Sequence, residues 1–347
     1  MSLELEKLGT KLTKEESTPI LKTINEFLKN KDKTIFPGYQ PVTLMRAHLN
    51  EILNQDYLVC EKSDGIRVLF IQFKDPYNNY LGFFLDRKLD FYKLNLRLPK
   101  NDFIVLDGEL VCDIIKDKSV YHYMICDCLI SNRENVTNLH LNERLTKALS
   151  FVVKYEVLNN SFKISVKKMF KPYGILEILN NRDKLHETDG LIFTPLKHPY
   201  KSGTEPLLLK WKPPYLNSVD FILKKTLDNW VYEMHCFGNK NQLVLFDYYY
   251  DLNDDLEPLE NSYDGLLAEL SYNFNKWVVD PSDLSKYQGG WEIIKFRTDK
   301  TTPNSYSVIL NIVKSINENI NHDFFEENLK SIYEKWQERN NVKRFKE

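Results

Sequence analysis

Short apolar runs follow one another from residue 57 to about residue 193, and this pattern restricts the fold more than any other feature of the sequence. The runs are rich in β-branched and aromatic residues and are separated by Asp, Gly and Asn, which is typical of strands joined by turns. Strands are expected at 57–61, 66–73, 80–85, 103–106, 109–112, 121–128, 191–194 and 207–211. Helical spacing of apolar residues predicts helices at 15–34, 142–153 and 173–181. The expected fold class is therefore α+β.

A second domain is expected after Pro213-Pro214, the clearest break in the sequence. The chain has 347 residues, a length that favours two domains. Short apolar runs resume beyond the break and predict a small antiparallel barrel. They lie at 219–224, 230–237 and 243–250. The tail from Ser305 to Lys335 is expected to be helical, so the predicted domains are 1–214 and 215–347.

Charge balance and cysteine content exclude several classes of protein. With 47 basic and 49 acidic residues the net charge is -2, so a basic coat for nucleic acid is excluded and any polyanion must bind a local patch. Five cysteines without a CxxC pair argue against a disulfide framework or a zinc site and favour a reducing compartment. The N-terminus has no apolar signal segment, and no apolar run approaches the ~18 residues of a membrane span.

The segment Lys62-Ser63-Asp64-Gly65-Ile66-Arg67 lies between two predicted strands and brings a lysine and an arginine to a tight turn. A lysine held rigidly at such a turn can act as a covalent nucleophile. The alternative is an ordinary solvated turn. Lys62 is therefore the candidate nucleophile of the chain.

Two further Asp-Gly pairs carry carboxylates beside predicted strands. Asp107 and Glu109 flank one glycine, and Asp189 precedes the other. Carboxylates from separate strand ends can converge on Mg²⁺, which takes few protein ligands and keeps several waters. The alternative for each aspartate is a turn or a cap. A fourth pair, Asp264-Gly265, is interpreted as a turn alone.

Two groups of charged residues complete the candidate set. By strand alternation Lys210 and Lys212 share one face, where an anion such as phosphate would relieve their repulsion; a charged edge strand is the alternative. Arg297, Asp299 and Lys300 follow an apolar run in the second domain, where a salt-bridged loop is the alternative. A lysine nucleophile, carboxylates and cations together suit phosphoryl-type transfer, in which catalysis is mostly positioning and charge neutralisation.

The order of these motifs resembles that of the covalent nucleotidyltransferases, a superfamily that includes mRNA capping enzymes and ATP-dependent DNA and RNA ligases. The segments that carry the resemblance are Lys62–Arg67, Asp107–Glu109, Tyr123–Leu129, Asp189–Phe193, Leu209–Lys212 and Arg297–Lys300. Each motif is weak alone, but all of them occur in the family's order between residues 57 and 304.

The finer resemblance is to the fungal-type, stand-alone GTP:RNA guanylyltransferases. It rests on Phe36–Val42, Leu85–Arg87, Phe193–Pro195, Lys210–Pro213, Asn217–Phe221 and Asp299–Asn304. It implies an ATP-grasp-like nucleotidyltransferase domain, with antiparallel sheets and flanking helices, followed by an OB-fold β-barrel with helices. The chain departs from the family at Cys126, where an aromatic residue is usual, and at Lys295, where arginine is common. Tyr123 is a possible substitute for the aromatic, but strand alternation turns it to the opposite face.

The resemblance implies that Lys62 bonds covalently to GMP from GTP and passes it to the diphosphate 5′ end of RNA. The residues implied in GTP binding are Lys62, Arg67, Arg87, Glu109, Asp189, Lys210 and Lys212. Those implied in catalysis are Lys62, Lys210, Lys212, Asp220, Arg297, Asp299 and Lys300, the last four acting once the second domain closes. Glu109 and Asp189 are the implied ligands of Mg²⁺ or Mn²⁺.

The same resemblance implies three partners: nascent RNA with a diphosphate 5′ end, a separate RNA 5′-triphosphatase, and the phosphorylated C-terminal domain of RNA polymerase II. It implies the nucleus as the compartment and no membrane. Two other functions stay open. An ATP-dependent polynucleotide ligase would use the same chemistry through lysyl-AMP, and a non-catalytic RNA-binding or scaffold protein would keep the fold without the reaction.

Overall fold

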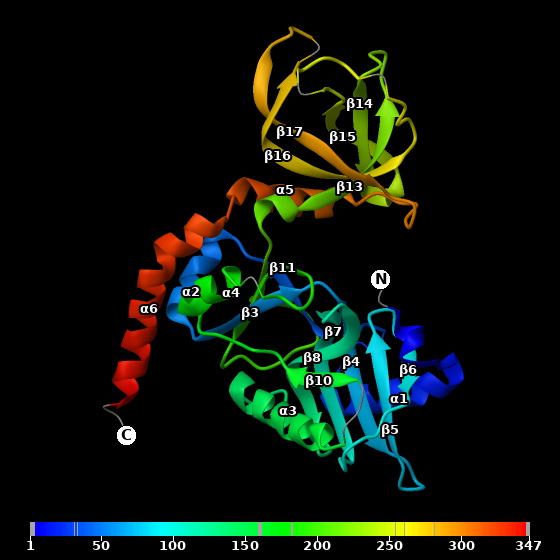
Figure 1. Cartoon of the computed structure of the whole chain (residues 1–347), viewed down its shortest axis with the longest axis vertical. Coiled ribbons are helices and arrows are strands. Elements are labelled where there is room, and N and C mark those ends of the chain that lie inside the picture. The colour runs from blue at the N-terminus through cyan, green and yellow to red at the C-terminus, as the bar shows by residue number, and fades with distance from the viewer. Residues whose placement is uncertain are drawn as a thin grey trace. The chain divides into compact units, whose positions relative to one another are not determined.

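The computed structural model of the chain divides into two compact units (Figure 1). It describes residues 4–344 except 31, 33, 159–161, 182, 254, 260 and 281. The first unit comprises Met1–Trp211 and Phe325–Glu347, and the second comprises Lys212–Phe324. The break follows Trp211, near the boundary expected at 214. The C-terminal helix groups mostly with the first unit, whereas the sequence analysis placed it in the second domain. Within the described residues no helix is long and apolar enough to cross a lipid bilayer.

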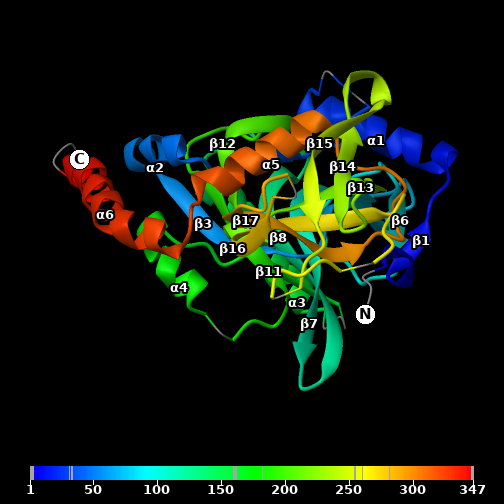
Figure 2. The ribbon, with the colours of Figure 1, turned by 90° about the horizontal axis from the view of Figure 1, so that it is seen from above.

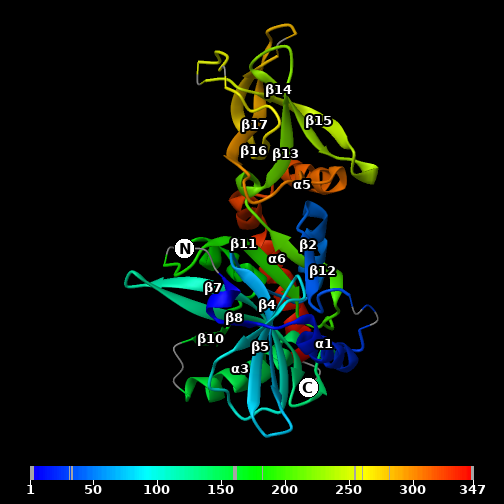
Figure 3. The ribbon, with the colours of Figure 1, turned by 90° about the vertical axis from the view of Figure 1, so that its right-hand side faces the viewer.

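The larger sheet of the first unit has the strand order β1-β6-β5-β4-β7-β8-β10, with β9 paired to β8. Its strands are β1 (Gly9–Lys11), β4 (Ile66–Lys74), β5 (Tyr80–Asp86), β6 (Phe91–Leu94), β7 (Phe103–Ile115), β8 (Lys118–Ser131), β9 (Glu134–Asn135) and β10 (Lys163–Val166). The pairing of β10 with β8 is parallel, and the others are antiparallel. The β7–β8 hairpin projects beyond the rest of the sheet (Figure 2, Figure 3).

Both faces of this sheet are buried, which explains the unbroken apolar run of β4. Val68 and Phe70 join a core that includes Phe151 of α3 (Leu141–Glu156). Leu69 joins a second core with residues of α1 (Lys14–Leu28). A strand that is covered on both faces has apolar residues at consecutive positions of its sequence. Helix α1 is shorter than predicted, because Lys29 adopts a left-handed conformation (φ 56°) that ends it.

The smaller sheet of the first unit has the order β2-β12-β11-β3. Its strands are β2 (Tyr39–Thr43), β3 (Tyr57–Ser63), β11 (Thr188–Pro195) and β12 (Gly203–Trp211). Asp64 and Gly65 alone join β3 to β4, yet these strands belong to different sheets. The expected turn therefore carries the chain from one sheet to the other, and Lys62 lies at this crossing. The unit also contains α2 (Leu49–Asn54), α4 (Ile175–Leu179) and most of α6 (His322–Arg344).

The turn predicted at Asp107-Gly108 is wrong. Strand β7 runs through both residues, and a register shift in its pairing with β8 takes the place of the turn. A Cβ atom on Gly108 would lie 2.5 Å from the carbonyl oxygen of Met124 and 2.7 Å from Cζ of Tyr123. Glycine is therefore required here for the close approach of the neighbouring strand, not for reversal of the chain.

The second unit is a β-rich domain with five antiparallel strands in the order β15-β14-β13-β16-β17, the strand number of an OB-fold. They are β13 (Ser218–Lys225), β14 (Val231–Phe237), β15 (Leu243–Tyr250), β16 (Leu267–Val279) and β17 (Lys286–Phe296). Helix α5 (Tyr306–Glu318) packs on their core through Ile309. The tail predicted as one helix is two, because Asn319 is left-handed (φ 44°) and ends α5 before α6 begins.

Candidate active site

A cavity of about 250 Å³ opens in the first unit, and strands of both sheets line it. The structure brings these expected nucleotide-binding residues to its wall: Lys62, Arg67, Arg87, Glu109 and Lys210. They come from five different strands or strand ends, so only the folded chain assembles them. The cavity is the candidate active site.

An ion pair holds Lys62 at this cavity. Its Nζ lies 2.6 Å from Oδ1 of Asp189, and only 24% and 16% of the two side chains are exposed. In the pairing of β3 with β11, Lys62 lies opposite Gly190, and the register shifts between Thr188 and Gly190. Asp189 therefore sits at an irregularity beside the lysine. The ammonium group is fixed in one place and must release a proton before it can attack an electrophile.

Glu109 lines the same cavity and is a suitable ligand for a cation. Burial raises the pKa of Glu109 to about 7, although the positive charges of Lys167, Arg67 and Lys62 act in the opposite direction. A bound cation would favour the ionised form of this carboxyl group. With Asp189 as a second carboxylate and phosphate oxygens from a nucleotide, the donor set fits Mg²⁺ or Mn²⁺.

Arg67 lines the cavity, but much of its hydrogen-bonding capacity is used elsewhere. Its Nε and NH2 groups donate to the two carboxylate oxygens of Asp107 at 3.1 and 2.6 Å. The hydroxyl of Tyr200 donates to the same carboxylate at 2.7 Å. Arg67 is thus a fixed positive charge at the wall. Arg87, in contrast, is exposed just after β5 and is the freer of the two to reach a sugar.

Lys210 and Lys212 do not lie on a common strand face, contrary to the prediction. Strand β12 ends at Trp211, and Pro213 has no N–H group with which to continue the sheet. Lys210 lines the cavity. Lys212 begins the second unit and is absent from the described residues that line this cavity.

The cavity also has an apolar wall, which includes Cys126, Met169, Ile192 and Leu208. Tyr123 is fully buried in the core, as strand alternation predicts, and its hydroxyl donates to the carbonyl oxygen of Leu106 at 2.9 Å. Tyr123 therefore does not replace the aromatic residue that is usual at Cys126. A flat base in this cavity would pack against aliphatic and sulfur-containing side chains.

Sequence analysis missed Lys167, which also lines the cavity. It is 5% exposed, and its Nζ donates to the hydroxyl of Ser63 at 2.8 Å. Lysine is almost never fully buried unless it is paired, so Lys167 joins the candidate residues of the site. Lys167 is an even number of residues from the exposed Lys163 of β10, so strand alternation places both on one face and indicates a solvated lysine.

The second unit gathers the other expected residues into one ionic cluster. Arg297 donates to Asp220 at 3.0 Å, to Glu269 at 3.2 Å, and through Nε and NH2 to Asp299 at 2.8 and 2.7 Å. Nζ of Lys300 lies 2.7 Å from the other oxygen of Asp220, which is buried in β13. These ion pairs are the ones that the salt-bridged loop interpretation predicts, and they hold two cations beside the buried carboxylate of Asp220.

Comparison with known proteins gives matches over most of the chain. Residues 4–214 match the family model of the mRNA capping enzyme catalytic domain, and residues 216–325 match that of the mRNA capping enzyme C-terminal domain. The mRNA-capping enzyme subunit alpha of Saccharomyces cerevisiae is 32% identical, over 88% of this chain and 80% of that protein. The subunits of the same name from Candida glabrata and Schizosaccharomyces pombe are each 30% identical, over 90% of this chain and 84% of theirs.

Among solved structures, a mycobacterial DNA ligase D complexed with ATP and MES aligns with a TM-score of 0.40 and 14% identity, over 76% of this chain and 95% of that one. A similarity of this size does not favour ligase activity.

Proposed function

Since the chain belongs to the mRNA capping enzyme family and is an mRNA guanylyltransferase, we propose that it carries out the reaction through a covalent lysyl-GMP intermediate on Lys62. The observation that carries this proposal is the placement of Lys62. Its Nζ is fixed by Asp189 at a cavity whose wall holds further cations and a buried carboxyl group. Such a wall suits a triphosphate, and the fixed amine of Lys62 can act on it as a nucleophile.

In the first step, neutral Nζ of Lys62 attacks the α-phosphorus of GTP. An N–P bond forms and the nitrogen releases one proton to solvent, while the bond from the α-phosphorus to the bridging oxygen breaks and pyrophosphate leaves with its electron pair. In the second step, a terminal oxygen of the RNA 5′ diphosphate attacks the same phosphorus. The N–P bond breaks, the amine regains a proton, and the RNA carries GMP through a triphosphate bridge.

Mg²⁺ or Mn²⁺, held by Glu109 and Asp189, would neutralise phosphate charge in this reaction. Lys210 would contact the α-phosphate, and Arg67 and Arg87 would contact the ribose. These assignments are supported by the cavity wall, which includes all of these residues except Asp189, itself ion-paired to Lys62.

Two buried donors support guanine as the base. Nζ of Lys167 and the hydroxyl of Ser63 lie 2.8 Å apart at the cavity. A carbonyl oxygen, such as O6 of guanine, accepts hydrogen bonds from such groups, whereas the exocyclic amine of adenine does not. A site built to bond one of these groups rejects the other strongly.

The ionic cluster of the second unit is proposed to act in the first step only, by orienting the pyrophosphate that leaves. Its members are Asp220, Arg297, Asp299 and Lys300, whereas Lys212 is proposed to contact the α-phosphate together with Lys210. The support is chemical: two cations are held in fixed geometry by a buried carboxylate. Such groups bind polyphosphate well when they are brought to it.

The partners and the compartment are further parts of the proposal. The relatives are called subunit alpha, which implies another chain in those proteins. A separate RNA 5′-triphosphatase would supply the diphosphate end, and the phosphorylated C-terminal domain of RNA polymerase II would deliver nascent RNA in the nucleus.

The test is incubation with Mg²⁺ and GTP or ATP labelled at the α-phosphate, followed by denaturing electrophoresis and peptide mapping. We expect a GTP-specific label on Lys62, and none in Lys62→Met. Label from ATP instead would identify a polynucleotide ligase. No label from either nucleotide would revive the scaffold interpretation and reject the proposed reaction.

A further inference from the structure

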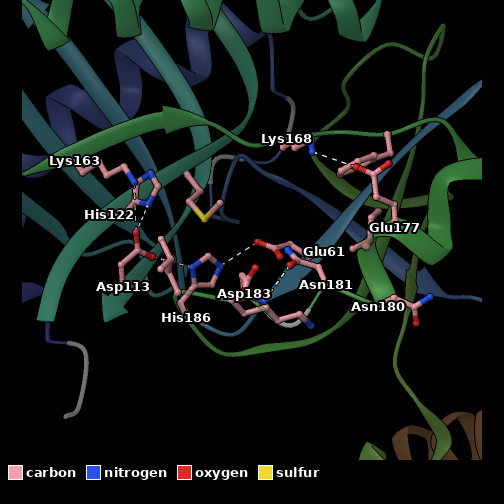
Figure 4. Close-up of a pocket in the computed structure, with 15 residues that line it drawn as sticks. Glu61, Asp113, His122, Lys163, Lys168, Glu177, Asn180, Asn181, Asp183 and His186 are labelled. Atoms are coloured by element: carbon pink, nitrogen blue, oxygen red, sulfur yellow. Dashed lines mark hydrogen bonds and ion pairs between the residues drawn. The ribbon is translucent and has the colours of Figure 1, made fainter. Parts of the chain in front are cut away.

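A second cavity of about 610 Å³ lies in the first unit, and its lining residues include Glu61, Asp113, His122 and His186 (Figure 4). Figure 4 shows Asp113 between two imidazoles, those of His122 and His186, with His186 directed toward Glu61. Nδ1 of His186 lies 2.9 Å from Oδ1 of Asp113. Its Nε2 lies 3.1 Å from Oε1 of Glu61 and 3.0 Å from Oγ of Ser63.

Ser63 connects the two cavities. Its side chain lines the active-site cavity, and its oxygen accepts a hydrogen bond from Lys167 at 2.8 Å. His186, which lines the second cavity, is within hydrogen-bonding distance of the same oxygen. One of the two donors proposed above to bind the base, the hydroxyl of Ser63, is thus in contact with a histidine that is not among the described residues lining the active-site cavity.

We propose that His186 is a positioning residue, which sets the direction of the Ser63 hydroxyl and thereby tunes the choice of a purine with a carbonyl group at C6. This inference rests on the proposed function. It adds a residue that acts through Ser63 and not by contact with the nucleotide.

The hydrogen-bonding partners fix where the protons of His186 lie. An ionised carboxylate only accepts hydrogen bonds, so Nδ1 of His186 carries a proton and donates it to Asp113. Burial raises the pKa of Asp113, but its hydrogen bonds with His186 and His122 outweigh this effect and lower the pKa, which keeps the carboxylate ionised. Nε2 of His186 is consequently the variable atom: an acceptor in neutral imidazole and a donor in the cation.

The two states of Nε2 turn the Ser63 hydroxyl in opposite directions. With neutral His186, the hydroxyl donates to Nε2, and its hydrogen points away from the active site. With the cation, Nε2 donates to Glu61 and Ser63, so the hydroxyl hydrogen is released. The nearby thioether of Met124, 3.9 Å away, is a weak acceptor that a carbonyl oxygen in the cavity would displace.

Protonated His186 therefore adds a second donor beside Lys167, and neutral His186 removes it. Burial alone lowers the pKa of His186, but its hydrogen bonds to Glu61 and Asp113 outweigh this effect and place the pKa above the ordinary value. The cation, and with it the second donor, is then present at low pH and is lost as the pH rises through the raised pKa.

The other charged groups around His186 come from several strands. Glu61 comes from β3, Asp113 from β7 and His122 from β8, and Lys163 of β10 lies 3.6 Å from Asp113. Lys184 lines the same cavity and donates to Thr188 at 2.6 Å. Burial lowers the pKa of His122, and the charge of Lys163 acts in the same direction, whereas the pKa of His186 is raised.

The test compares GTP with 2,6-diaminopurine riboside triphosphate, which carries an amine in place of O6 and keeps the 2-amino group. The measured quantity is the ratio of their second-order rate constants for adduct formation, taken at the same pH between 6 and 9. Ionisation of Lys62 affects both nucleotides alike and cancels in the ratio. We expect the ratio to fall by about three- to tenfold as the pH rises, the value of one hydrogen bond.

Three variants separate this account from a structural effect. His186→Gln has no titrating ring, and Ser63→Ala has no hydroxyl, so each should give a ratio that does not vary with pH. His122→Gln is the matched control, because His122 bonds the other oxygen of Asp113 and contacts Ser165, not Ser63. It should keep the pH dependence of the wild type.

A wild-type ratio that stays constant with pH, while GTP still labels Lys62, overturns the role of His186 and leaves the proposed function intact. A ratio that titrates in His186→Gln as it does in the wild type also overturns that role. Failure of both nucleotides to label the protein would instead reject the proposed function, and this inference with it.

Discussion

The buried pair of Arg144 with Asp127 offers the sharpest test of what holds the active-site cavity in place. Arg144 of α3 is fully buried, and its Nε and NH2 groups donate to the two oxygens of Asp127 at 2.7 and 2.8 Å. The hydroxyl of Tyr39, which lines the cavity, donates to the same carboxylate at 3.1 Å. Arg144→Met removes the countercharge and leaves the carboxylate buried.

Breaking a buried pair by removing one partner costs about 3–5 kcal/mol, because an uncompensated charge remains. Arg144 also donates to the carbonyl oxygen of Leu139, and the loss of that bond adds about 1 kcal/mol. The free energy of unfolding of the first unit should therefore fall by about 4–6 kcal/mol. Lys335→Ala, which removes an exposed pair with Glu338, should cost less than about 0.5 kcal/mol.

The assay is urea unfolding read by hydrogen–deuterium exchange and mass spectrometry, so that peptides of each unit are followed separately. The double variant Asp127→Asn, Arg144→Met should regain part of the lost stability, because no buried charge is left. A loss below about 1 kcal/mol in Arg144→Met, or a double variant no more stable than it, would refute the reasoning.

Three further predictions test the site and the fold. Lys62→Met should bind GTP in equilibrium dialysis yet give no labelled adduct, and a label in this variant would place the nucleophile elsewhere. Lys300→Ala removes the 2.7 Å ion pair with Asp220 and should slow adduct formation by about tenfold or more while sparing transfer from a preformed adduct to RNA; equal loss of both steps would contradict a role confined to the first. Gly108→Ala forces a Cβ atom to within 2.5 Å of the Met124 carbonyl oxygen and should lower the free energy of unfolding by about 1–3 kcal/mol; an unchanged urea midpoint would show that the irregular pairing can relax.

Much of the strand framework is predictable from local pattern. The runs at 57–61 and 66–73 correspond to β3 and β4. For β4 the reason is that cores on both faces of the sheet keep apolar residues in consecutive positions. The Lys62 turn is predictable as well, since Asp64-Gly65 separates two such runs. What the pattern did not reveal is that the two strands enter different sheets.

The sequence-based predictions that were wrong or incomplete failed mainly because contacts between distant residues decide the local structure. Asp107-Gly108 has the local signature of a turn, but pairing of β7 with both β4 and β8 keeps the chain extended. Lys167 has the spacing of a solvated lysine and becomes a cavity residue only because Ser63, 104 positions away, meets it. Lys212 is separated from Lys210 because the strand ends between them.

The chain leaves the first unit after Trp211 and returns to it at Phe325, so the second unit is an insertion within the first. On its return, Phe325 of α6 packs 5.0 Å from the ring of Trp211 and 6.2 Å from that of Phe193. A recombinant fragment that stops at Trp211 would leave these two rings uncovered and would invite aggregation. A fragment meant to keep the first unit whole would therefore omit residues 212–324 and join residue 211 to residue 325, so that both segments of the unit are present.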